Sequence, residues 1–302
     1  MRVALVGYGA VASVHARALR QLGATISAVC GPNQETVKAF AAEHAALRWC
    51  SQLADGLCDA DAVIVASPSA LHAAQAAEAL AAGVHTLVEF PPCSTVAEAQ
   101  QLWQRAETAG VVLQCAHTSR YVEPYRRLRA WIHEGRLGEI RCVDYLRHLV
   151  PRQRSWIDDA LLHHAAHPLD LLLYWFSLLR PRGAVVRPVG RPAEDVALVA
   201  ELSNGAPASI SISYSSSLSR CWCVVVGSRC TVSADGFSNL QSDDPALAFT
   251  GSPDEVYEAA IRAQDAAFVQ TCRGEGKSVG WERTMELITL IDQYRQMSMG
   301  DG

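Results

Sequence analysis

Three histidines, His163, His164 and His167, lie within five residues near the middle of the chain, between the carboxylates of Asp158 and Asp170. The unperturbed pKa of histidine, about 6.5, lies closer to neutrality than that of the other side chains, so histidine suits proton transfer. A proton must leave a hydroxyl group when a hydride leaves the carbon that bears it, and a positioned histidine can take that proton. We therefore expect His167 to be a catalytic acid or base, with His163 or His164 orienting the substrate or relaying the proton.

The spacing of these histidines also has two other interpretations. On one continuous helix, His163 and His167 would share a face and His164 would approach His167. The same arrangement suits a packed structural cluster, or a zinc site completed by Asp170. Pro168 has no backbone N–H to donate, which favours a helix that begins near His167 instead. Of the three interpretations we expect catalysis, and no metal.

The N-terminus carries a glycine motif, Gly7-Tyr8-Gly9-Ala10-Val11-Ala12, between an apolar run at residues 3–6 and a helical pattern that continues to Leu22. The first glycine permits a tight turn and the second lets a pyrophosphate approach the backbone. The small third residue allows close packing, and the helix N-terminus offers oriented N–H groups. The motif predicts a dinucleotide site formed by Gly7, Tyr8, Gly9, Ala10 and Val11.

The second predicted strand ends at Cys30-Gly31-Pro32-Asn33, which we expect to meet the ribose of the cofactor through Cys30 and Gly31. An acidic residue at this point would hold the ribose hydroxyls of NAD, and an arginine would favour the 2′-phosphate of NADP. Neither is present. Without an acid there is no repulsion of the 2′-phosphate, so the sequence favours NADP(H) weakly over NAD(H).

Strands alternate with helices through the first part of the chain, which predicts an α/β fold with a doubly wound parallel sheet. The pattern changes near residue 118, and strands dominate from there on. Asn204-Gly205 predicts a hairpin, followed by a strictly alternating strand over residues 210–215. We expect a dinucleotide-binding domain over residues 1–117, and a second α/β domain for substrate binding and oligomerisation over residues 118–302.

The composition excludes several classes of protein. A net charge of −5 over 302 residues argues against a nucleic-acid surface, and apolar runs such as residues 171–176 are too short to span a membrane. The chain runs from Met1 directly into a strand, which argues against a signal peptide. Its ten cysteines are scattered without a Cys-x-x-Cys pair, so we expect buried, reduced thiols in a cytoplasmic protein.

Several motifs occur together in this chain. They are the glycine motif, Ser67-Pro68-Ser69 with His72, Gly83-Val84-His85 before Glu89-Phe90-Pro91, and His167 with Asp170. Over nearly the whole chain they resemble the glucose–fructose oxidoreductase/inositol dehydrogenase/MocA (GFO/IDH/MocA) family. That resemblance implies an N-terminal Rossmann domain and a C-terminal α/β domain with a large, open, mostly antiparallel sheet. It also implies a homodimer or higher homo-oligomer formed through that sheet.

The chain departs from most of that family at Phe90, where a lysine usually contacts the reacting hydroxyl. Two branches lack the lysine in this way. The segments 117–121, 154–158 and 163–167 resemble the branch of 4-carboxy-2-hydroxymuconate-6-semialdehyde dehydrogenases. The other branch, biliverdin reductase, resembles residues 89–109 but does not share the run of histidines.

The resemblance also implies roles for single residues. Arg120 and Arg154 are expected to bind carboxylates of the substrate, because the planar guanidinium matches the geometry of a carboxylate. A surface ion pair is the alternative for Arg120, and Glu89 is expected to hold the loop beside the nicotinamide. The expected substrate-binding residues are Arg120, Tyr121, Arg154 and Asp170, and further cofactor-binding residues are Ser67, Pro68, His72, Glu89, Phe90 and Trp156.

The expected reaction is hydride transfer between NADP or NAD and a hydroxyl-bearing carbon, most simply a cyclic hemiacetal that becomes a lactone. A small, carboxylated substrate is expected. Two alternatives stay open: an NADPH-dependent reductase of the biosynthetic or biliverdin type, and a sensor that binds the cofactor without turnover. The retention of three histidines beside two carboxylates argues against the sensor, because a binding module has no need of proton-transfer groups.

Overall fold

The computed structural model describes residues 1–151, 158–189, 192–277 and 279–299. The chain forms two compact units: Met1–Thr118 with Ile261–Ile288, and Ser119–Ala260 with the residues from Thr289 onward. This grouping differs from the expected division at residue 118, because residues 261–288 pack with the first unit. Phe268 and Val269 join its core, which explains why this late segment returns to it.

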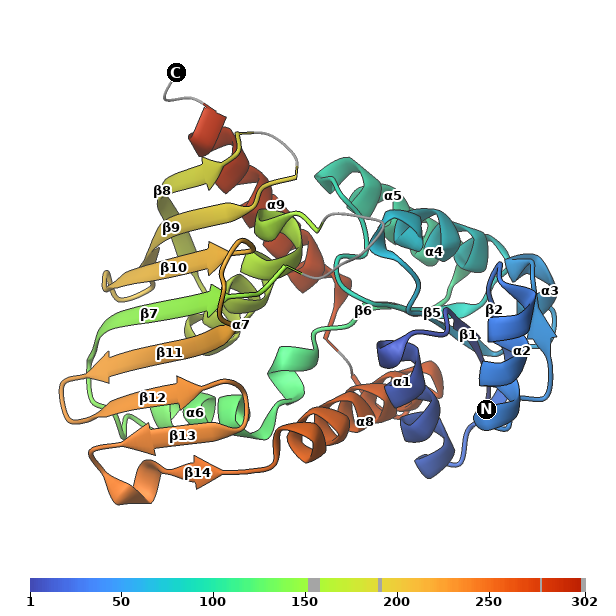
Figure 1. The fold of residues 1–302 in the computed structure, drawn as a ribbon, viewed down its shortest axis with the longest axis horizontal. Coiled ribbons are helices and arrows are strands. Elements are labelled where there is room, and N and C mark those ends of the chain that lie inside the picture. Colours follow the sequence, from blue (N-terminus) through green and yellow to red (C-terminus); the bar gives the residue numbers. More distant parts are fainter. Residues whose placement is uncertain (152–157, 190–191, 278, 300–302) are drawn as a thin grey trace. The chain divides into compact units, whose positions relative to one another are not determined.

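The first unit is built on a six-stranded parallel sheet in the order β3-β2-β1-β4-β5-β6 (Figure 1). This confirms the expected doubly wound sheet. The strands are β1 (Arg2–Val6), β2 (Thr25–Cys30), β3 (Trp49–Cys50), β4 (Ala62–Val65), β5 (His85–Val88) and β6 (Leu113–Cys115). The connecting helices are α1 (Ala10–Gln21), α2 (Gln34–Glu43), α3 (Leu53–Leu57), η1 (Ser69–Leu71), α4 (His72–Ala81) and α5 (Val96–Ala109).

Both faces of this sheet are buried. In β1, Val3 and Leu5 enter one core cluster together with residues of α1 and of α8 (Pro253–Cys272). Ala4 and Val6 enter the other cluster, with residues of α4, α5 and the start of α9 (Trp281–Met299). A strand buried on both faces reads as a continuous apolar run, which is why residues 3–6 carry no polar position.

The second unit contains an eight-stranded sheet in the order β14-β13-β12-β11-β7-β10-β9-β8. Only β7 and β10 run parallel, so the sheet is mostly antiparallel, as expected. The strands are β7 (Ile140–His148), β8 (Leu179–Arg187), β9 (Asp195–Leu202), β10 (Pro207–Ser213), β11 (Arg220–Gly227), β12 (Thr231–Asp235), β13 (Asn239–Ser242) and β14 (Phe249–Thr250). The helical elements are η2 (Thr118–Tyr121), α6 (Glu123–His133), η3 (Ala160–Ala165), α7 (Ala166–Phe176) and η4 (Pro245–Leu247).

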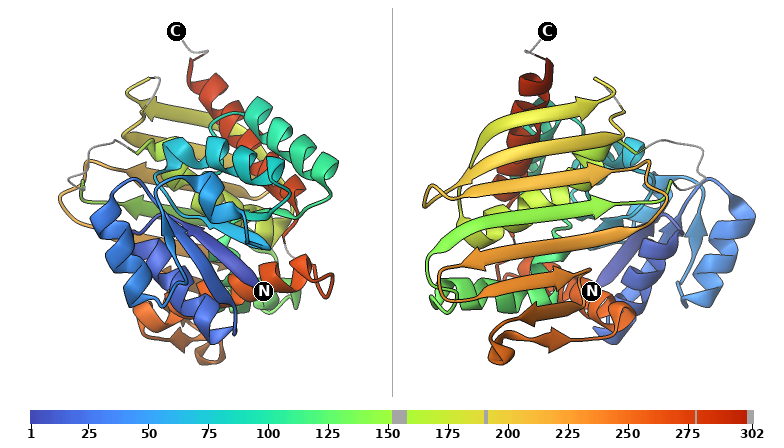
Figure 2. Two further views of the ribbon diagram at one scale, coloured as in Figure 1. Left: turned by 90° about the vertical axis from the view of Figure 1, so that its right-hand side faces the viewer. Right: turned by 60° about the vertical axis from the view of Figure 1, so that its left-hand side comes forward.

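Alternation along the strands gives this sheet one buried face and one more accessible face. Ile210 and Ile212 are buried, whereas Ser209 between two buried neighbours is exposed. The right-hand view of Figure 2 shows the strands side by side, with helices of the unit behind them. The serines of β10 make cross-strand contacts on the accessible face, for example Ser213 with Asp195 at 2.7 Å. This face is therefore polar but not covered by a helix of its own unit.

Two local features differ from the sequence expectation. Strand β8 was not expected, because Pro181 and Gly183 interrupt its pattern; an edge strand that pairs only with β9 tolerates them. The hairpin at Asn204-Gly205 is present, but only Gly205 has a positive φ. The Asn204 side chain instead donates to the Ile140 carbonyl at 2.9 Å.

Candidate active site

The histidine cluster lies on a helical segment that changes its pitch. Residues 160–165 form a π-helical turn, η3, and α7 continues from Ala166. The Asp159 side chain caps the turn by accepting from the Leu162 amide at 2.9 Å. The helical segment thus begins at Ala160, not near His167, and Pro168 falls in the first turn of α7. π-turns of this kind occur frequently at functional sites.

His163 is held by the backbone of the cap. His163 Nδ1 lies 3.1 Å from the Asp159 amide nitrogen and 3.2 Å from the Asp159 carbonyl oxygen, so it can accept from the first or donate to the second, depending on the tautomer. Its Nε2 lies 4.0 Å from Asp158 Oδ1, beyond hydrogen-bond range. The ring is therefore positioned by the backbone of Asp159.

His164 stacks on Tyr214, with ring centroids 4.6 Å apart. Its Nε2 lies 3.8 Å from Asp158 Oδ2, and among the described residues neither ring nitrogen has a hydrogen-bond partner. Burial lowers the pKa of His164 to about 4, so the ring is neutral at physiological pH. His164 and the Tyr214 hydroxyl, which donates at 2.8 Å, hold the pKa of Asp158 well below its usual range.

His167, on the first turn of α7, is more accessible than its neighbours on the helix, Ala166 and Pro168. Burial lowers the pKa of His167 well below 6.5, and the charge of Arg147 lowers it further, against the opposing influence of Asp170. The imidazole is therefore neutral near pH 7, and in either tautomer one of its ring nitrogens is an acceptor. A neutral imidazole is the form that can accept a proton from a substrate.

Arg120 and Asp170 form a buried ion pair. The Arg120 Nη2 and Nε atoms donate to Asp170 Oδ1 at 2.6 and 3.0 Å, and Nε also lies 3.1 Å from Oδ2. Both side chains are less than a tenth exposed, so this is not the surface ion pair that the sequence left open. The guanidinium also lies over the Tyr174 ring, 5.5 Å from its centroid. Two of the expected substrate ligands thus bind one another, while Tyr121 is half-buried in η2 beside Arg120.

Two further expected residues, Arg154 and Trp156, lie outside the described residues. Within the described ranges, no group of three or more histidine, cysteine, aspartate or glutamate side chains is arranged to hold a metal ion. In the same part of the chain, no helix is both long and apolar enough to cross a membrane. Of the ten free cysteines, Cys58 is exposed, so the expectation that the thiols are buried fails there.

The glycine motif of the first unit has the geometry that a dinucleotide requires. Gly7 adopts φ +106°, and a Cβ there would lie 2.4 Å from the Ala66 carbonyl oxygen, so only glycine fits. A Cβ on Gly9 would meet nothing within 4 Å, and no side chain caps α1. The first N–H groups of α1 therefore face open space with Gly9 and Ala10 exposed, which fits a bound pyrophosphate.

Fewer atoms at the end of β2 could reach a ribose than the sequence indicates. The Cys30 thiol is buried in the core, which raises its pKa to about 12, so only the backbone of Cys30 could reach a ribose. A Cβ on Gly31 would lie 2.2 Å from the Tyr8 ring, which places that ring directly against the glycine. Asn33 accepts from the Thr36 amide at 3.0 Å and caps α2. Residues 31–34 present neither a carboxylate nor a cation.

His72 ties together the loops that follow β4 and β5. Its ring nitrogens lie 2.8 Å from the carbonyl oxygens of Ser67 and Pro91, and the side chain is buried. His72 therefore positions these loops. Phe90 is half-buried against the core cluster beneath α4 and α5 and brings no titratable group.

Sequence analysis did not predict that His15, in the first unit, binds two carboxylates. His15 of α1 is fully buried between Asp265 of α8, at 2.8 Å from Nδ1, and Glu89, at 3.0 Å from Nε2. Burial alone would lower its pKa, but Asp265 and Glu89 raise the pKa of His15 to about 10. An imidazolium therefore holds the Glu89 carboxylate at the end of β5. The only sequence signal is a histidine on an otherwise apolar helix face, and Asp265 is 250 residues away.

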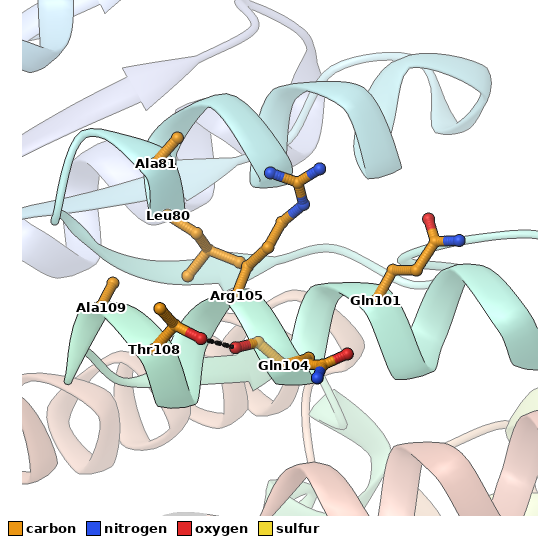
Figure 3. Close-up of a pocket in the computed structure, with 7 residues that line it drawn as sticks. All are labelled: Leu80, Ala81, Gln101, Gln104, Arg105, Thr108 and Ala109. Atoms are coloured by element: carbon orange, nitrogen blue, oxygen red, sulfur yellow. Dashed lines mark hydrogen bonds between the residues drawn. The ribbon is translucent and has the colours of Figure 1, made fainter.

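A surface groove of about 550 Å³ lies elsewhere, between α4 and α5 (Figure 3). Leu80 and Ala81 of α4 face Gln101, Gln104 and Arg105 of α5 across it. None of the expected site residues lines this groove. This groove therefore does not locate the chemistry of the chain.

Comparison with known proteins agrees with this geometry. Residues 1–117 match the family model described as an oxidoreductase family with an NAD-binding Rossmann fold, and residues 125–233 match the GFO/IDH/MocA C-terminal domain. The chain belongs to the GFO/IDH/MocA oxidoreductase family. It is thus a nicotinamide-dependent oxidoreductase, and the expected family and fold are confirmed.

Individual relatives give the degree of similarity. The chain is 30% identical over 228 residues to the 4-carboxy-2-hydroxymuconate-6-semialdehyde dehydrogenase of Sphingobium sp. (strain NBRC 103272 / SYK-6), covering 71% of this chain and 72% of that enzyme. It is 29% identical over 265 residues to the dTDP-3,4-didehydro-2,6-dideoxy-alpha-D-glucose 3-reductase of Streptomyces violaceoruber, covering 79% and 77%. The WlbA dehydrogenase of Bordetella pertussis, solved with NADH and UDP-GlcNAcA, has the same fold, with a TM-score of 0.85 at 22% identity over 99% of this chain and 95% of that one.

The buried position of His15 makes a prediction for stability. His15→Ala leaves Asp265 buried without a partner, and removal of one member of a buried ion pair costs about 3–5 kcal/mol. Chemical denaturation should show this loss, and His15→Ala combined with Asp265→Asn should be more stable than His15→Ala alone. His44→Ala is the matched control, because His44 is also buried in this unit but contacts the Ser13 hydroxyl, at 3.1 Å, and the exposed Glu43 carboxylate, at 3.7 Å, instead of a buried carboxylate.

The same histidine should make stability depend on pH. Because its folded pKa of about 10 lies above the unfolded value of 6.5, its contribution is complete below pH 6.5 and is lost as pH rises toward 10. The stability difference between wild type and His15→Ala should therefore shrink over that range. A difference that stays constant from pH 6 to 10 would show that His15 is not held as an imidazolium.

Proposed function

We propose that this chain oxidises a hydroxyl-bearing carbon, most simply that of a cyclic hemiacetal, in a small carboxylated substrate. The observation that carries the proposal is His167: a half-buried imidazole that its surroundings keep neutral, within a cluster of histidines and carboxylates. The similarity to 4-carboxy-2-hydroxymuconate-6-semialdehyde dehydrogenase, at 30% identity, supports this substrate class.

The proposed roles follow from the geometry of each residue. A bound nicotinamide cofactor would supply the acceptor for the hydride that leaves the substrate carbon. His167 takes the hydroxyl proton, and the new C=O bond completes a lactone. His163 is oriented by Asp159, while His164 and Tyr214 hold Asp158, so these residues position His167 and the substrate. Phe90 brings no cation where most of the family has a lysine, so the histidine is the proposed acid or base.

The role of His167 is tested by substitution. His167→Ala should lower turnover at least about 100-fold, because a positioned acid or base contributes 10²- to 10⁴-fold. The assay follows reduced-nicotinamide absorbance after freshly generated 4-carboxy-2-hydroxymuconate-6-semialdehyde is added with NADP+ or NAD+. His148→Ala is the control, because His148 lies on β7 and contacts Ser211 at 3.1 Å outside the cluster.

The outcomes of this assay separate the possibilities. Near-normal turnover of His167→Ala would remove His167 from the mechanism. If the wild-type chain binds NADPH but does not oxidise this semialdehyde, the substrate assignment fails. Reduction of a carbonyl substrate by NADPH would then favour a reductase, the activity named for the Streptomyces violaceoruber relative.

We also propose that the chain prefers NADP(H). Support comes from residues 31–34, which offer no carboxylate to repel a 2′-phosphate. Asn33→Asp adds that carboxylate and preserves the cap on α2, since aspartate caps as well as asparagine. The variant should lose kcat/KM with NADP+ by roughly tenfold or more while retaining NAD+ activity, because like charges in proximity repel. An unchanged ratio would place the 2′-phosphate away from Asn33.

A homodimer, or a higher homo-oligomer, is proposed through the accessible face of the eight-stranded sheet. Val199 and Trp222 are exposed by 47% and 37% on β9 and β11, beside the serines of β10. Large apolar side chains that no helix covers favour a second copy as the partner. Light scattering of the purified chain should give at least twice the mass of one chain, and Val199→Arg should reduce it. A monomeric wild type would contradict the proposal.

A further inference from the structure

Arg147 lies at the C-terminal end of β7, on the same face of the sheet as the buried residues Val143 and Tyr145. It is half-buried, and no described residue makes a hydrogen bond or an ion pair with its guanidinium. Other arginines of this unit that are at least half-buried do have partners: Arg120 pairs with Asp170, Arg295 with Asp159, and Arg129 donates to the Tyr174 carbonyl oxygen. A cation withdrawn from water without a counter-charge is destabilising unless something else compensates it.

The surroundings of Arg147 are those of the histidine cluster. In the pairing of β7 with β10, Arg147 is opposite Ile212, and η3, which carries His163 and His164, packs against β10. The charge of Arg147 is close enough to lower the pKa of both His164 and His167. The charge of Arg147 therefore acts on the part of the second unit that contains His167, the proposed base.

The carboxylates of this region are already bound to other groups. Asp170 is held by Arg120, and Asp158 accepts from Tyr214 and faces His164. Both carboxylates are thus held by groups other than Arg147, beside a half-buried, neutral imidazole.

We propose that Arg147 binds a carboxylate of the substrate and so places the substrate hydroxyl against His167. Guanidinium binds carboxylate in a bidentate manner, which fixes orientation as well as position. The proposal rests on the proposed function. It gives Arg147 the carboxylate-binding role that the sequence analysis expected of Arg120 and Arg154. Binding would also give the Arg147 guanidinium a carboxylate partner.

Binding of a probe tests this site without turnover. Benzene-1,3-dicarboxylate is offered to the cofactor-loaded protein, and the matched neutral compound is benzene-1,3-dicarboxamide. Arg147→Gln should weaken binding of the dicarboxylate about 10- to 100-fold in calorimetry, the range for hydrogen bonds to charged groups. Arg141→Gln is the matched control: Arg141 is on the same strand, but it is 60% exposed and pairs with Glu139 at 3.2 Å.

A purely structural arginine would behave differently. If Arg147 awaits an anion, Arg147→Met should be at least as stable as wild type without ligand, whereas a structural role predicts a lower Tm. Arg147→Lys keeps the charge but loses the bidentate geometry, and should bind the dicarboxylate with intermediate affinity. It also serves as the test variant if Arg147→Gln does not fold.

Each result bears on one proposal. Equal dicarboxylate affinity of Arg147→Gln and wild type, or no dicarboxylate binding to either, overturns the assignment of Arg147. If the semialdehyde is oxidised and its KM is the same in Arg147→Gln, the proposed function stands and the Arg147 site fails. If the semialdehyde is not oxidised but dicarboxylate binding depends on Arg147, the anion site stands and the substrate of the proposed function fails.

Discussion

The ion pair between Arg120 and Asp170 is the constraint on which the candidate site depends. It joins η2 to α7 through two strong hydrogen bonds, and Asp170 lies one helical turn after His167. The pair fixes α7 and also neutralises the carboxylate nearest in sequence to the proposed base. With Asp170 compensated, burial and the charge of Arg147 prevail, and His167 stays neutral. One buried interaction thus holds the helix that carries the imidazole and offsets the carboxylate that would raise its pKa.

Compensation of buried charge also explains how the site could respond to its substrate. The charge of Arg147 lowers the pKa of His167, so a carboxylate bound to Arg147 would reduce that influence and raise the pKa. Coupling of this kind is reciprocal: anion binding would favour the protonated imidazole, and protonation would favour anion binding. A base is most effective when its pKa lies near the working pH. The substrate would therefore make His167 a better base as it binds.

In the first unit, too, neighbouring charges set the protonation state of a histidine, but there they keep it charged. There two carboxylates, Asp265 and Glu89, surround one imidazole and keep His15 charged, whereas His164 and His167 are kept neutral. Three histidines with the same intrinsic chemistry thus have different protonation states because their neighbours differ. The Glu89 side chain, held by His15, is fixed at the end of β5, beside the position where Phe90 replaces the family lysine.

Local pattern was enough to predict the parallel sheet and the turn of the glycine motif, because each depends on residues close together in sequence. The family resemblance added the open second sheet. Strand β8 was missed because its pattern is broken by Pro181 and Gly183, and the return of residues 261–288 to the first unit depends on packing across the whole chain.

The partners of charged groups could not be predicted for the same reason. Arg120 meets Asp170 across 50 residues and His15 meets Asp265 across 250. An expected substrate ligand, Arg120, is therefore paired with a carboxylate of its own unit, and Arg147 attracted no notice in the sequence.

The protonation state of His167 is the most direct test of this account. Long-range ¹H–¹⁵N correlation spectra of histidine-labelled, cofactor-loaded protein would report it, with His167→Gln to assign the signal. The account predicts a neutral ring at pH 6.5 and above without substrate, and a pKa that rises when benzene-1,3-dicarboxylate is added. A ring that is mostly imidazolium at pH 6.5 in the absence of any anion would contradict it.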